Sequence, residues 1–520
     1  MRHAIIALCF AASTCAAAPL QLNEQEQAGQ QIYLKGESPS GARLVGRMGL
    51  GALELAGAPI ACGNCHGEDG RGRAEGGVEP QNIQWSELTK PYGHRHPNGR
   101  NHAAFDERLL RQTVLEGVDP DGNRLDPAMP RYAMSAKDFA ALSAYLKKLE
   151  ATLDPGLTDD TIRIGTLLPL EGRLAALGKS LRELWTGYFA ALNERGGVHG
   201  RRLELVVENL PADTAEAQAR AKGLLADRNV FALLAPLSAG VESELSEAAV
   251  TAKVPVVGPL TLFPEDVRAS NAHVFHLLPG VAELAQVLVR HADQELGLAE
   301  RPILLWHSDS DSGRATAEGI AASLDRAGWR EIMLAPFPAR GVSVDSFASA
   351  LKARGIASIL VLGGGADLRA FAAAAARLEW TPYLLVPGAL APRDIVDLPP
   401  AFRDHVILAY PSAPDDQRVD ALREYMSFAK DAASRANQPI QIAAYSAGML
   451  LVEGLKRTGR DVTRRKLIAA LETVQGFDTG LIPKVSYNAD RRIGAMGGYL
   501  LAVDLERKGL RPLGGYRRLP

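Results

Sequence analysis

The segment Cys62-Gly63-Asn64-Cys65-His66 carries the most specific signal in this chain of 520 residues. Its spacing, Cys-x-x-Cys-His, is that of a c-type haem attachment site. Two thiols three positions apart on a tight turn can form thioethers with the two vinyl groups of one porphyrin, while the adjacent imidazole reaches the iron. We therefore expect one covalent haem c, with Cys62 and Cys65 as the thioether residues and His66 as the proximal iron ligand.

A zinc site and a thioredoxin-like redox pair are alternative interpretations of this spacing. Zinc would need two more soft ligands, and the only other cysteines, Cys9 and Cys15, belong to an N-terminal segment that we expect to be removed. A thioredoxin motif lies between a strand and a helix, whereas the flanks here are glycine-rich. Haem attachment is the favoured interpretation.

The first 17 residues are typical of a secretory signal peptide. A short basic start precedes an apolar run over residues 4–12, and small residues surround the expected cleavage site after Ala17. A lipid anchor at Cys15 is the less favoured alternative, because Ala12-Ser13-Thr14 is a poor lipoprotein signal. No run reaches about 18 uninterrupted apolar residues, so we expect a periplasmic protein without a transmembrane segment.

The haem iron needs a second axial ligand or an open position. Two methionines and three histidines are candidates: Met129, Met134, His94, His96 and His102. Met129 is favoured because prolines on both sides of the Ala128-Met129 pair fix an extended loop that can hold a thioether still. Met134, just before an expected helix over residues 135–149, is the alternative. His94 and His96 are interpreted as part of a solvated loop.

Residues 22–150 resemble class I cytochromes c. The resemblance rests on five features, namely an N-terminal helix with Gly29 and Tyr33, the Cys62–Gly67 turn, a helix near Phe105–Glu116, the Met129-Pro130 loop and a C-terminal helix with Tyr145. It implies an all-α domain over residues 18–150, with His66 and Met129 as the iron ligands. Such ligation suits electron transfer better than oxygen chemistry. Residues 34–61 form an insertion that we expect to cover the haem edge or to contact a partner.

Beyond a polar linker at residues 151–160, strand-like and helical segments alternate over residues 161–520. This alternation indicates parallel sheets covered by helices on both faces, and the length calls for two lobes. The expected strands are 161–168, 202–208, 230–235, 254–257, 303–307, 359–362, 383–386 and 405–409, with helices at 177–195, 214–227, 313–327 and 368–378. We expect the first lobe at about 161–279 and 410–475, and the second at about 280–409 and 476–510.

This second part resembles type I periplasmic solute-binding proteins of the leucine/isoleucine/valine-binding class. The similar segments are 162–172, 193–201, 476–480 and 485–487. The resemblance implies a multidomain chain in which two doubly wound α/β lobes follow the cytochrome-like domain and close on a small ligand like a hinge. It also implies an ABC permease as a partner of such proteins.

Ligand residues carry over from this resemblance only in part. Ser238 matches the carboxylate-binding serine and Thr261 a second binding position, although both can also be ordinary helix or turn caps. Ser312-Gly313 replaces the usual Tyr-Gly, and no carboxylate stands beside Gly388-Ala389 to hold an ammonium group. An amino-acid ligand is therefore disfavoured. Gly363-Gly364-Gly365 is interpreted as a turn, because the last glycine of a dinucleotide motif is missing.

The charge balance excludes a nucleic-acid partner, since 58 basic and 60 acidic residues give a net charge of −2. No catalytic triad, metalloprotease helix or carboxylate pair stands out, so we expect no enzyme activity. The first hypothesis is an exported electron-transfer protein that serves a periplasmic redox partner, such as the quinoprotein dehydrogenase of alcohol oxidation, which some solute-binding proteins of this type accompany. The alternative is an ABC-transporter receptor with a redox-sensing haem. Peroxidase activity conflicts with a Met129 ligand.

Overall fold

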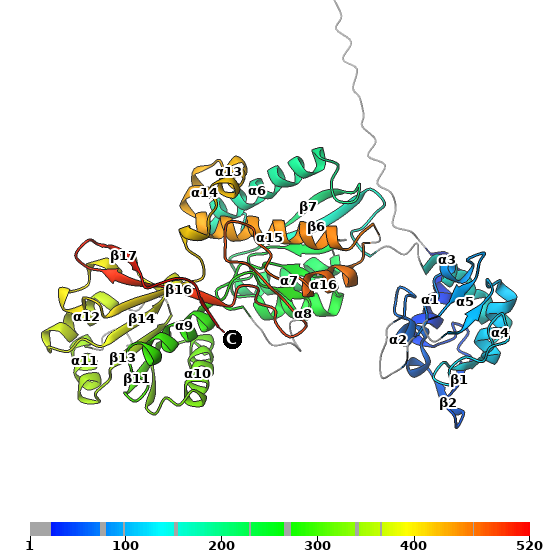
Figure 1. Ribbon diagram of the computed structural model, residues 1–520, viewed down its shortest axis with the longest axis horizontal. Coiled ribbons are helices and arrows are strands. Elements are labelled where there is room, and N and C mark those ends of the chain that lie inside the picture. Colours follow the sequence, from blue (N-terminus) through cyan, green and yellow to red (C-terminus); the bar gives the residue numbers. More distant parts are fainter. Residues whose placement is uncertain are drawn as a thin grey trace, which may run out of the picture. The chain divides into compact units, whose positions relative to one another are not determined.

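The structure is a computed structural model that describes residues 22–72, 78, 80–96, 99–149, 154–227, 230–264, 272–337, 343–363, 367–460 and 462–519. The expected signal peptide, with Cys15, and residues 151–153 of the expected linker lie outside this described part. The chain divides into two compact units, Met1–Leu153 and Asp154–Pro520 (Figure 1). None of the described helices is both long enough and apolar enough to cross a membrane.

The first unit is mainly helical, and its helices are α1 (Glu24–Lys35), α2 (Cys62–His66), α3 (Trp85–Leu88), α4 (Glu107–Glu116) and α5 (Ala136–Lys148). Helix α1 packs on α5 at Gly29, where an added Cβ would lie 2.0 Å from the carbonyl oxygen of Ala141. The glycine therefore lets the two backbones approach closely. Beside this crossing, the rings of Tyr33 and Tyr145 are 5.4 Å apart, so both tyrosines named by the sequence pattern belong to one core.

Two small antiparallel sheets are added to this helical unit. Strands β1 (Val45–Met48) and β2 (Leu53–Ala56) form a hairpin within the 34–61 insertion, and β1 also pairs with β5 (Arg131–Ala133). Strands β3 (His94–Arg95) and β4 (Asn101–His102) form the second sheet. The all-α expectation did not include these sheets, which arise in segments where glycines permit tight turns.

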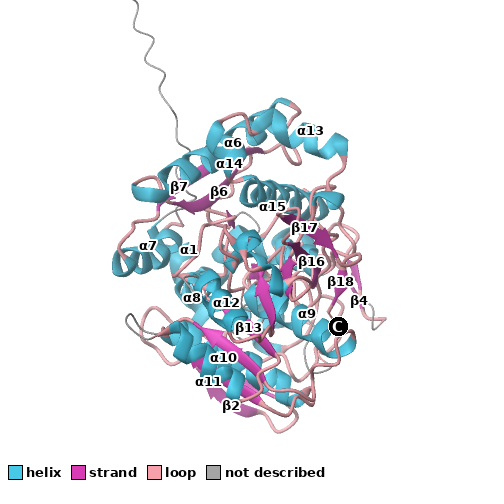
Figure 2. Cartoon of the chain, turned by 90° about the vertical axis from the view of Figure 1, so that its left-hand side faces the viewer, coloured by secondary structure: helices cyan, strands magenta, loops and turns pink. Residues whose placement is uncertain are grey.

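The first lobe of the second unit has a parallel sheet in the order β10-β9-β8-β6-β7. Helices α6, α13, α15 and α16 contribute to the core on one face, whereas α7 and α8 contribute to the core on the other. The elements are β6 (Thr161–Leu168), α6 (Ala175–Glu194), β7 (Arg202–Asn209), α7 (Thr214–Asp227), β8 (Ala232–Leu234), α8 (Glu242–Ala252), β9 (Val256–Val257), β10 (Val274–Phe275), α13 (Val419–Phe428), α14 (Ala432–Ala436), α15 (Gln438–Arg457) and α16 (Arg464–Glu472). Figure 2 shows α6 beside strands β6 and β7.

The second lobe has a mixed sheet in the order β12-β11-β13-β14-β15-β16-β17, with β18 paired to β16. Alternate residues of β11 face two cores, Ile303 and Leu305 toward α9 and α10, and Leu304 and Trp306 toward α11 and α12. The elements are α9 (Val281–Gln294), β11 (Ile303–His307), α10 (Asp311–Arg326), β12 (Ile332–Pro336), α11 (Val344–Ala353), β13 (Ser358–Leu362), α12 (Leu368–Arg377), β14 (Tyr383–Pro387), β15 (Val406–Tyr410), β16 (Gly497–Asp504), β17 (Gly509–Pro512) and β18 (Arg517–Arg518).

The expected lobe boundaries need one correction. Within the segment 476–496, which we expected in the second lobe, Leu481, Val485 and Tyr487 are fully buried in a core of the first lobe. The Tyr487 hydroxyl also donates a 2.9 Å hydrogen bond to the carbonyl oxygen of His276. Only from Gly497 onward does the chain pair with the second sheet. The burial of these side chains assigns the segment to the first lobe. The order of strands and helices along the chain does not reveal this burial.

Candidate functional site

The Cys-x-x-Cys-His segment forms the single-turn helix α2, as the expected attachment turn requires. The helix ends at Gly67, whose φ of 77° is readily adopted only by glycine. The Asn64 side chain donates a 2.7 Å hydrogen bond to the carbonyl oxygen of Ala58, and the Gly72 amide donates to the carbonyl oxygen of His66 at 2.7 Å. These bonds fix the turn from both ends and leave Cys62 and Cys65 as free thiols.

The His66 imidazole is oriented by the backbone. It is only 8% exposed, and its Nδ1 lies 2.8 Å from the carbonyl oxygen of Gln81. A carbonyl can only accept, so Nδ1 carries the hydrogen and Nε2 keeps the lone pair needed for a metal. Burial lowers the pKa of His66, an effect partly opposed by the Gln81 hydrogen bond, so the ring is held in the neutral form that binds iron.

The two cysteines have different surroundings. Cys62 packs against the core, with its Sγ 3.8 Å from the hydroxyl of Tyr132, whereas Cys65 is exposed. Burial raises the pKa of the Cys62 thiol to about 11, so it stays protonated at neutral pH. Tyr132 is itself held by a 2.6 Å hydrogen bond to the carbonyl oxygen of Ile60.

A cavity of about 1360 Å³ adjoins both thiols and His66. It exceeds the volume of about 300–1,000 Å³ that is usual for small-molecule sites, and apolar side chains such as Phe105, Leu142 and Leu146 form part of its wall. Met129 lines the cavity. Met134 is not among its described lining residues and packs against the core instead. The donor set and the volume therefore fit a haem, with Met129 better placed than Met134.

The Met129 loop is held by Arg131. The guanidinium of Arg131 donates hydrogen bonds to the carbonyl oxygens of Leu125 at 2.7 Å, of Asp126 at 3.0 Å and of Met129. Gly117 makes room for this side chain, since a Cβ there would lie 1.9 Å from the Arg131 Nε. The conformation of the loop thus depends on Arg131 and Gly117, which lie outside the segment Pro127–Pro130.

The 34–61 insertion contributes to the cavity wall through Met48, Pro59, Ile60 and Ala61. Its hairpin is tied to the methionine loop, because the Gly49 amide donates a 2.8 Å hydrogen bond to the carbonyl oxygen of Pro127. The insertion therefore forms part of the wall of the cavity that adjoins the attachment turn.

The interpretation of His94 and His96 as part of a solvated loop is wrong. His94, His96 and His102 all line the cavity, and His96 and His102 are only 5% and 7% exposed. The pairing of β3 with β4 brings the three rings together, with centroids 4.5 to 6.1 Å apart. The short sequence Gly93–Arg100, rich in polar residues, gives no sign that a hairpin turns these rings inward.

Of the two residues expected to bind a ligand in the second unit, Ser238 is buried and Thr261 is paired with another side chain of the protein. Ser238 is only 2% exposed, and its hydroxyl has no hydrogen-bond partner among the described residues. Thr261 donates a 2.7 Å hydrogen bond to Glu242, whose other carboxylate oxygen accepts from the Gly240 amide at 2.8 Å. Glu242 thus occupies the N-terminus of α8, where an anionic ligand is expected. Gly364 and Gly365 of the glycine run lie outside the described residues.

Comparison with known families divides the chain in the same way. Residues 54–150 match the cytochrome c family, and residues 161–509 match the periplasmic binding protein family. Among curated proteins, a Leu/Ile/Val-binding protein homolog 7 of Brucella abortus is 26% identical over 43% of this chain and 56% of its own length. The chemotactic signal transduction system substrate-binding protein BasB of Halobacterium salinarum is 27% identical over 31% of this chain and 41% of its own length. The matches thus span about half the length of these relatives.

Solved structures show the fold of the second unit. A branched-chain amino acid ABC transporter protein of Thermus thermophilus, solved with bound valine, covers 70% of this chain and 98% of its own length, with 15% identity and a TM-score of 0.54. A fatty acid ABC transporter substrate-binding protein from Thermomonospora curvata covers 71% and 95%, with 19% identity and a TM-score of 0.52. The chain therefore belongs to the periplasmic binding protein family and carries a cytochrome c domain ahead of the binding-protein fold.

Proposed function

We propose that this protein is an exported haem c electron-transfer protein with a fused solute-binding module, and that it serves a periplasmic redox system such as quinoprotein alcohol oxidation. One observation carries the proposal. The two free thiols, the oriented His66 imidazole and Met129 all border one cavity in a domain of the cytochrome c family.

The chain's own residues divide the task of holding the haem. Cys62 and Cys65 would form the two thioethers, which would prevent loss of the group. His66 would bind the iron through Nε2, because Nδ1 is committed to the Gln81 carbonyl. Met129 would supply the second iron ligand, from the loop that the Arg131 hydrogen bonds hold. When bound, the haem would supply one-electron chemistry, and histidine-methionine ligation would suit electron transfer better than oxygen chemistry.

The second candidate function is a solute receptor for an ABC permease, with the haem as a redox sensor. The binding-protein fold of the second unit favours it, since solved proteins of this fold are ABC-transporter substrate-binding proteins. In this case Ser238 and Thr261 would contact a small ligand. We rank it second because Ser238 is enclosed and Thr261 is already paired with Glu242.

Two measurements test the proposal. Protein purified from a host with c-type haem maturation should carry the mass of one haem per chain and show sharp Soret and α absorption. Replacing both cysteines, as Cys62→Ser with Cys65→Ser, should abolish the covalent mass, while Ser434→Ala, a replacement in the second unit, should leave it unchanged. A colourless wild-type protein from such a host would refute haem binding.

The redox role is then tested with the loaded protein. Mixing the oxidised protein with a reduced quinoprotein alcohol dehydrogenase in a stopped-flow instrument should give reduction of the haem without any added solute. Reduction that requires a small solute, accompanied by lobe closure in small-angle scattering, would favour the receptor function instead. Absence of reduction by the dehydrogenase under both conditions would refute the proposed partner class.

A further inference from the structure

The carboxylates of the haem need a partner in this cavity. Haem carries two propionate groups, which are ionised at neutral pH, and a charged group in a partly apolar site is costly unless it is paired. Three arginines are found among the described residues that line the cavity, namely Arg100, Arg124 and Arg131. Arg131 is already committed to the methionine loop, and Arg124 is exposed. Arg100 is therefore the arginine that we consider as the partner of a propionate.

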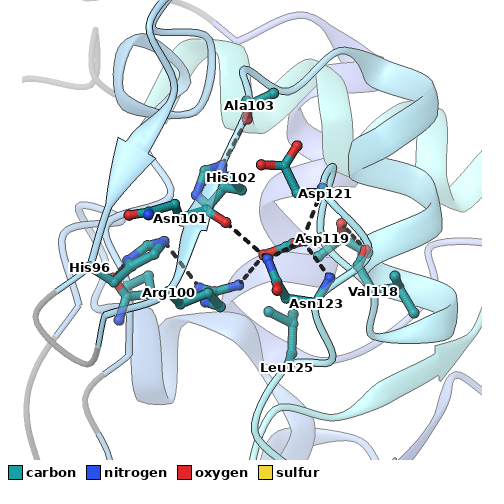
Figure 3. A network of polar contacts seen from close by, with 12 residues as sticks. His96, Arg100, Asn101, His102, Ala103, Val118, Asp119, Asp121, Asn123 and Leu125 are labelled. Atoms are coloured by element: carbon teal, nitrogen blue, oxygen red, sulfur yellow. Dashed lines mark hydrogen bonds and ion pairs between the residues drawn. The ribbon is translucent and has the colours of Figure 1, made fainter.

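Arg100 is fixed at both ends of its guanidinium (Figure 3). Its Nη1 donates a 3.0 Å hydrogen bond to Asp119, and its Nη2 lies 3.2 Å from Nε2 of His96. The Nδ1 atom of His96 donates to the side-chain oxygen of Gln81, so Nε2 accepts from Arg100. Burial and the Arg100 cation lower the pKa of His96 to about 4, which keeps this acceptor neutral. The Arg100 side chain is thereby held in one orientation.

Asp119 is the anchor of this arrangement. Its side chain is fully buried, and besides Arg100 it accepts hydrogen bonds from the amides of Asp121 at 3.1 Å and Asn123 at 2.9 Å. The Asn123 side chain donates both to Asp119 and, at 2.9 Å, to the carbonyl oxygen of Asn101 on β4. These neutral donors stabilise the carboxylate independently of Arg100. Asp119 thus ties Arg100 to the segment Asp121–Asn123 and, through Asn123, to β4.

We propose that Arg100 binds a propionate of the haem and that Asp119 and His96 position it for this contact. A guanidinium is suited to the task because its planar donors match a carboxylate in two parallel hydrogen bonds. The inference deepens the proposed function and rests on it. It gives the β3–β4 hairpin a role, since that hairpin holds Arg100 and two buried histidines against the cavity.

The test uses the haem-loaded full chain and two readouts other than electron-transfer activity. Resonance Raman spectroscopy reports the propionate bending mode, and spectroelectrochemistry reports the reduction potential. Arg100→Gln should shift the propionate mode and lower the potential, because a nearby cation favours the reduced haem, which carries one positive charge less. Arg111→Gln, at an exposed position on α4, removes the same charge away from the cavity and should leave the propionate mode unchanged.

Two further variants separate the roles. Arg100→Lys keeps the charge but not the planar guanidinium, so it should shift the propionate mode with a smaller change in potential than Arg100→Gln. If Arg100→Gln does not mature with haem, the propionate mode of Arg100→Lys tests the contact instead. Asp119→Asn should shift the same mode if Asp119 positions Arg100. An unchanged mode in Asp119→Asn would remove its positioning role.

A shift of the mode in Arg124→Gln, together with no shift in either Arg100 variant, would overturn the proposal and assign the propionate to Arg124. Equal effects of Arg100→Gln and Arg111→Gln on the potential, without any change in the propionate mode, would reduce Arg100 to a structural partner of Asp119. Failure of the proposed function has a different signature, because every variant and the wild type would then lack bound haem.

Discussion

Replacing Arg131 tests how the distal loop is held. The Arg131→Ala change removes three hydrogen bonds from one guanidinium to the carbonyl oxygens of Leu125, Asp126 and Met129. A hydrogen bond to a charged group contributes about 1.5–3 kcal/mol when it is buried. Arg131 is only half-buried, so water can replace part of each bond. We expect the free energy of unfolding of the first unit to fall by about 2–4 kcal/mol in total.

The effect should reach the iron ligand as well as stability. Without the guanidinium, the loop that presents Met129 loses its internal brace, so a fraction of the oxidised protein should lose methionine ligation. Chemical denaturation followed at the Soret band measures the stability change. The weak charge-transfer band of methionine-ligated ferric haem measures the ligation.

Two controls make the result specific. Arg124→Ala removes an exposed arginine from the same loop and should change stability little. Gly117→Ala keeps Arg131 but places a Cβ 1.9 Å from its Nε, and the glycine has a φ of 71°, so it should reproduce the Arg131→Ala phenotype. If Arg131→Ala keeps full methionine ligation and unchanged stability, the three hydrogen bonds of Arg131 do not hold the Met129 loop.

Other predictions concern the iron ligand, the core, pH and the second unit. Met129→Ala should lower the reduction potential and abolish the methionine charge-transfer band while Met134→Ala retains both; the reverse pattern would move the ligand to Met134. Gly29→Ala should destabilise the first unit by about 2–3 kcal/mol in denaturant titrations, because its Cβ would meet a backbone carbonyl at 2.0 Å, and an unchanged midpoint would count against this helix crossing. Burial lowers the pKa of His276 from 6.5 to about 3, so between these pH values the unfolded chain binds a proton at His276 that the folded chain does not. The free energy of unfolding should therefore decline as the pH falls from about 6.5 to about 3. His276→Gln should make this decline, measured by thermal unfolding, less steep. Calorimetry with leucine should give no saturable heat for the wild type, because Glu242 repels a carboxylate at the N-terminus of α8; micromolar binding would contradict this.

Local patterns were sufficient for much of the architecture. The predicted strand at 161–168 and the predicted helix at 214–227 coincide with β6 and α7, because hydrophobic periodicity is a property of each segment by itself. The predicted strand at 303–307 also coincides with β11, whereas the remaining predicted elements differ by a few residues at their ends, as at 230–235, where β8 covers only Ala232–Leu234. The antiparallel strands β16 to β18 were not predicted as strands. Strand β16 pairs with β15, which is distant in the sequence, whereas β17 and β18 follow β16 closely and pair with it.

The candidate site was predictable only where its chemistry is carried by a contiguous motif. Cys62, Cys65 and His66 share one helical turn, so their spacing alone indicates their common purpose. His96 and Arg100 lie in a stretch whose composition suggests solvent exposure, and Asp119 follows 19 residues after Arg100. Nothing local shows that these groups meet in a buried network.

The amino-acid order by itself determined the attachment turn, the alternation of strands and helices, and the division of the chain into two parts, because each depends on residues close together along the chain. Tertiary structure decided that Met129 rather than Met134 lines the cavity and that residues 476–493 belong mainly to the first lobe. It also decided that the Thr261 hydroxyl donates its hydrogen bond to Glu242. These outcomes depend on burial and on hydrogen bonds between groups distant in sequence, and the free energy of such contacts exists only once the chain has folded.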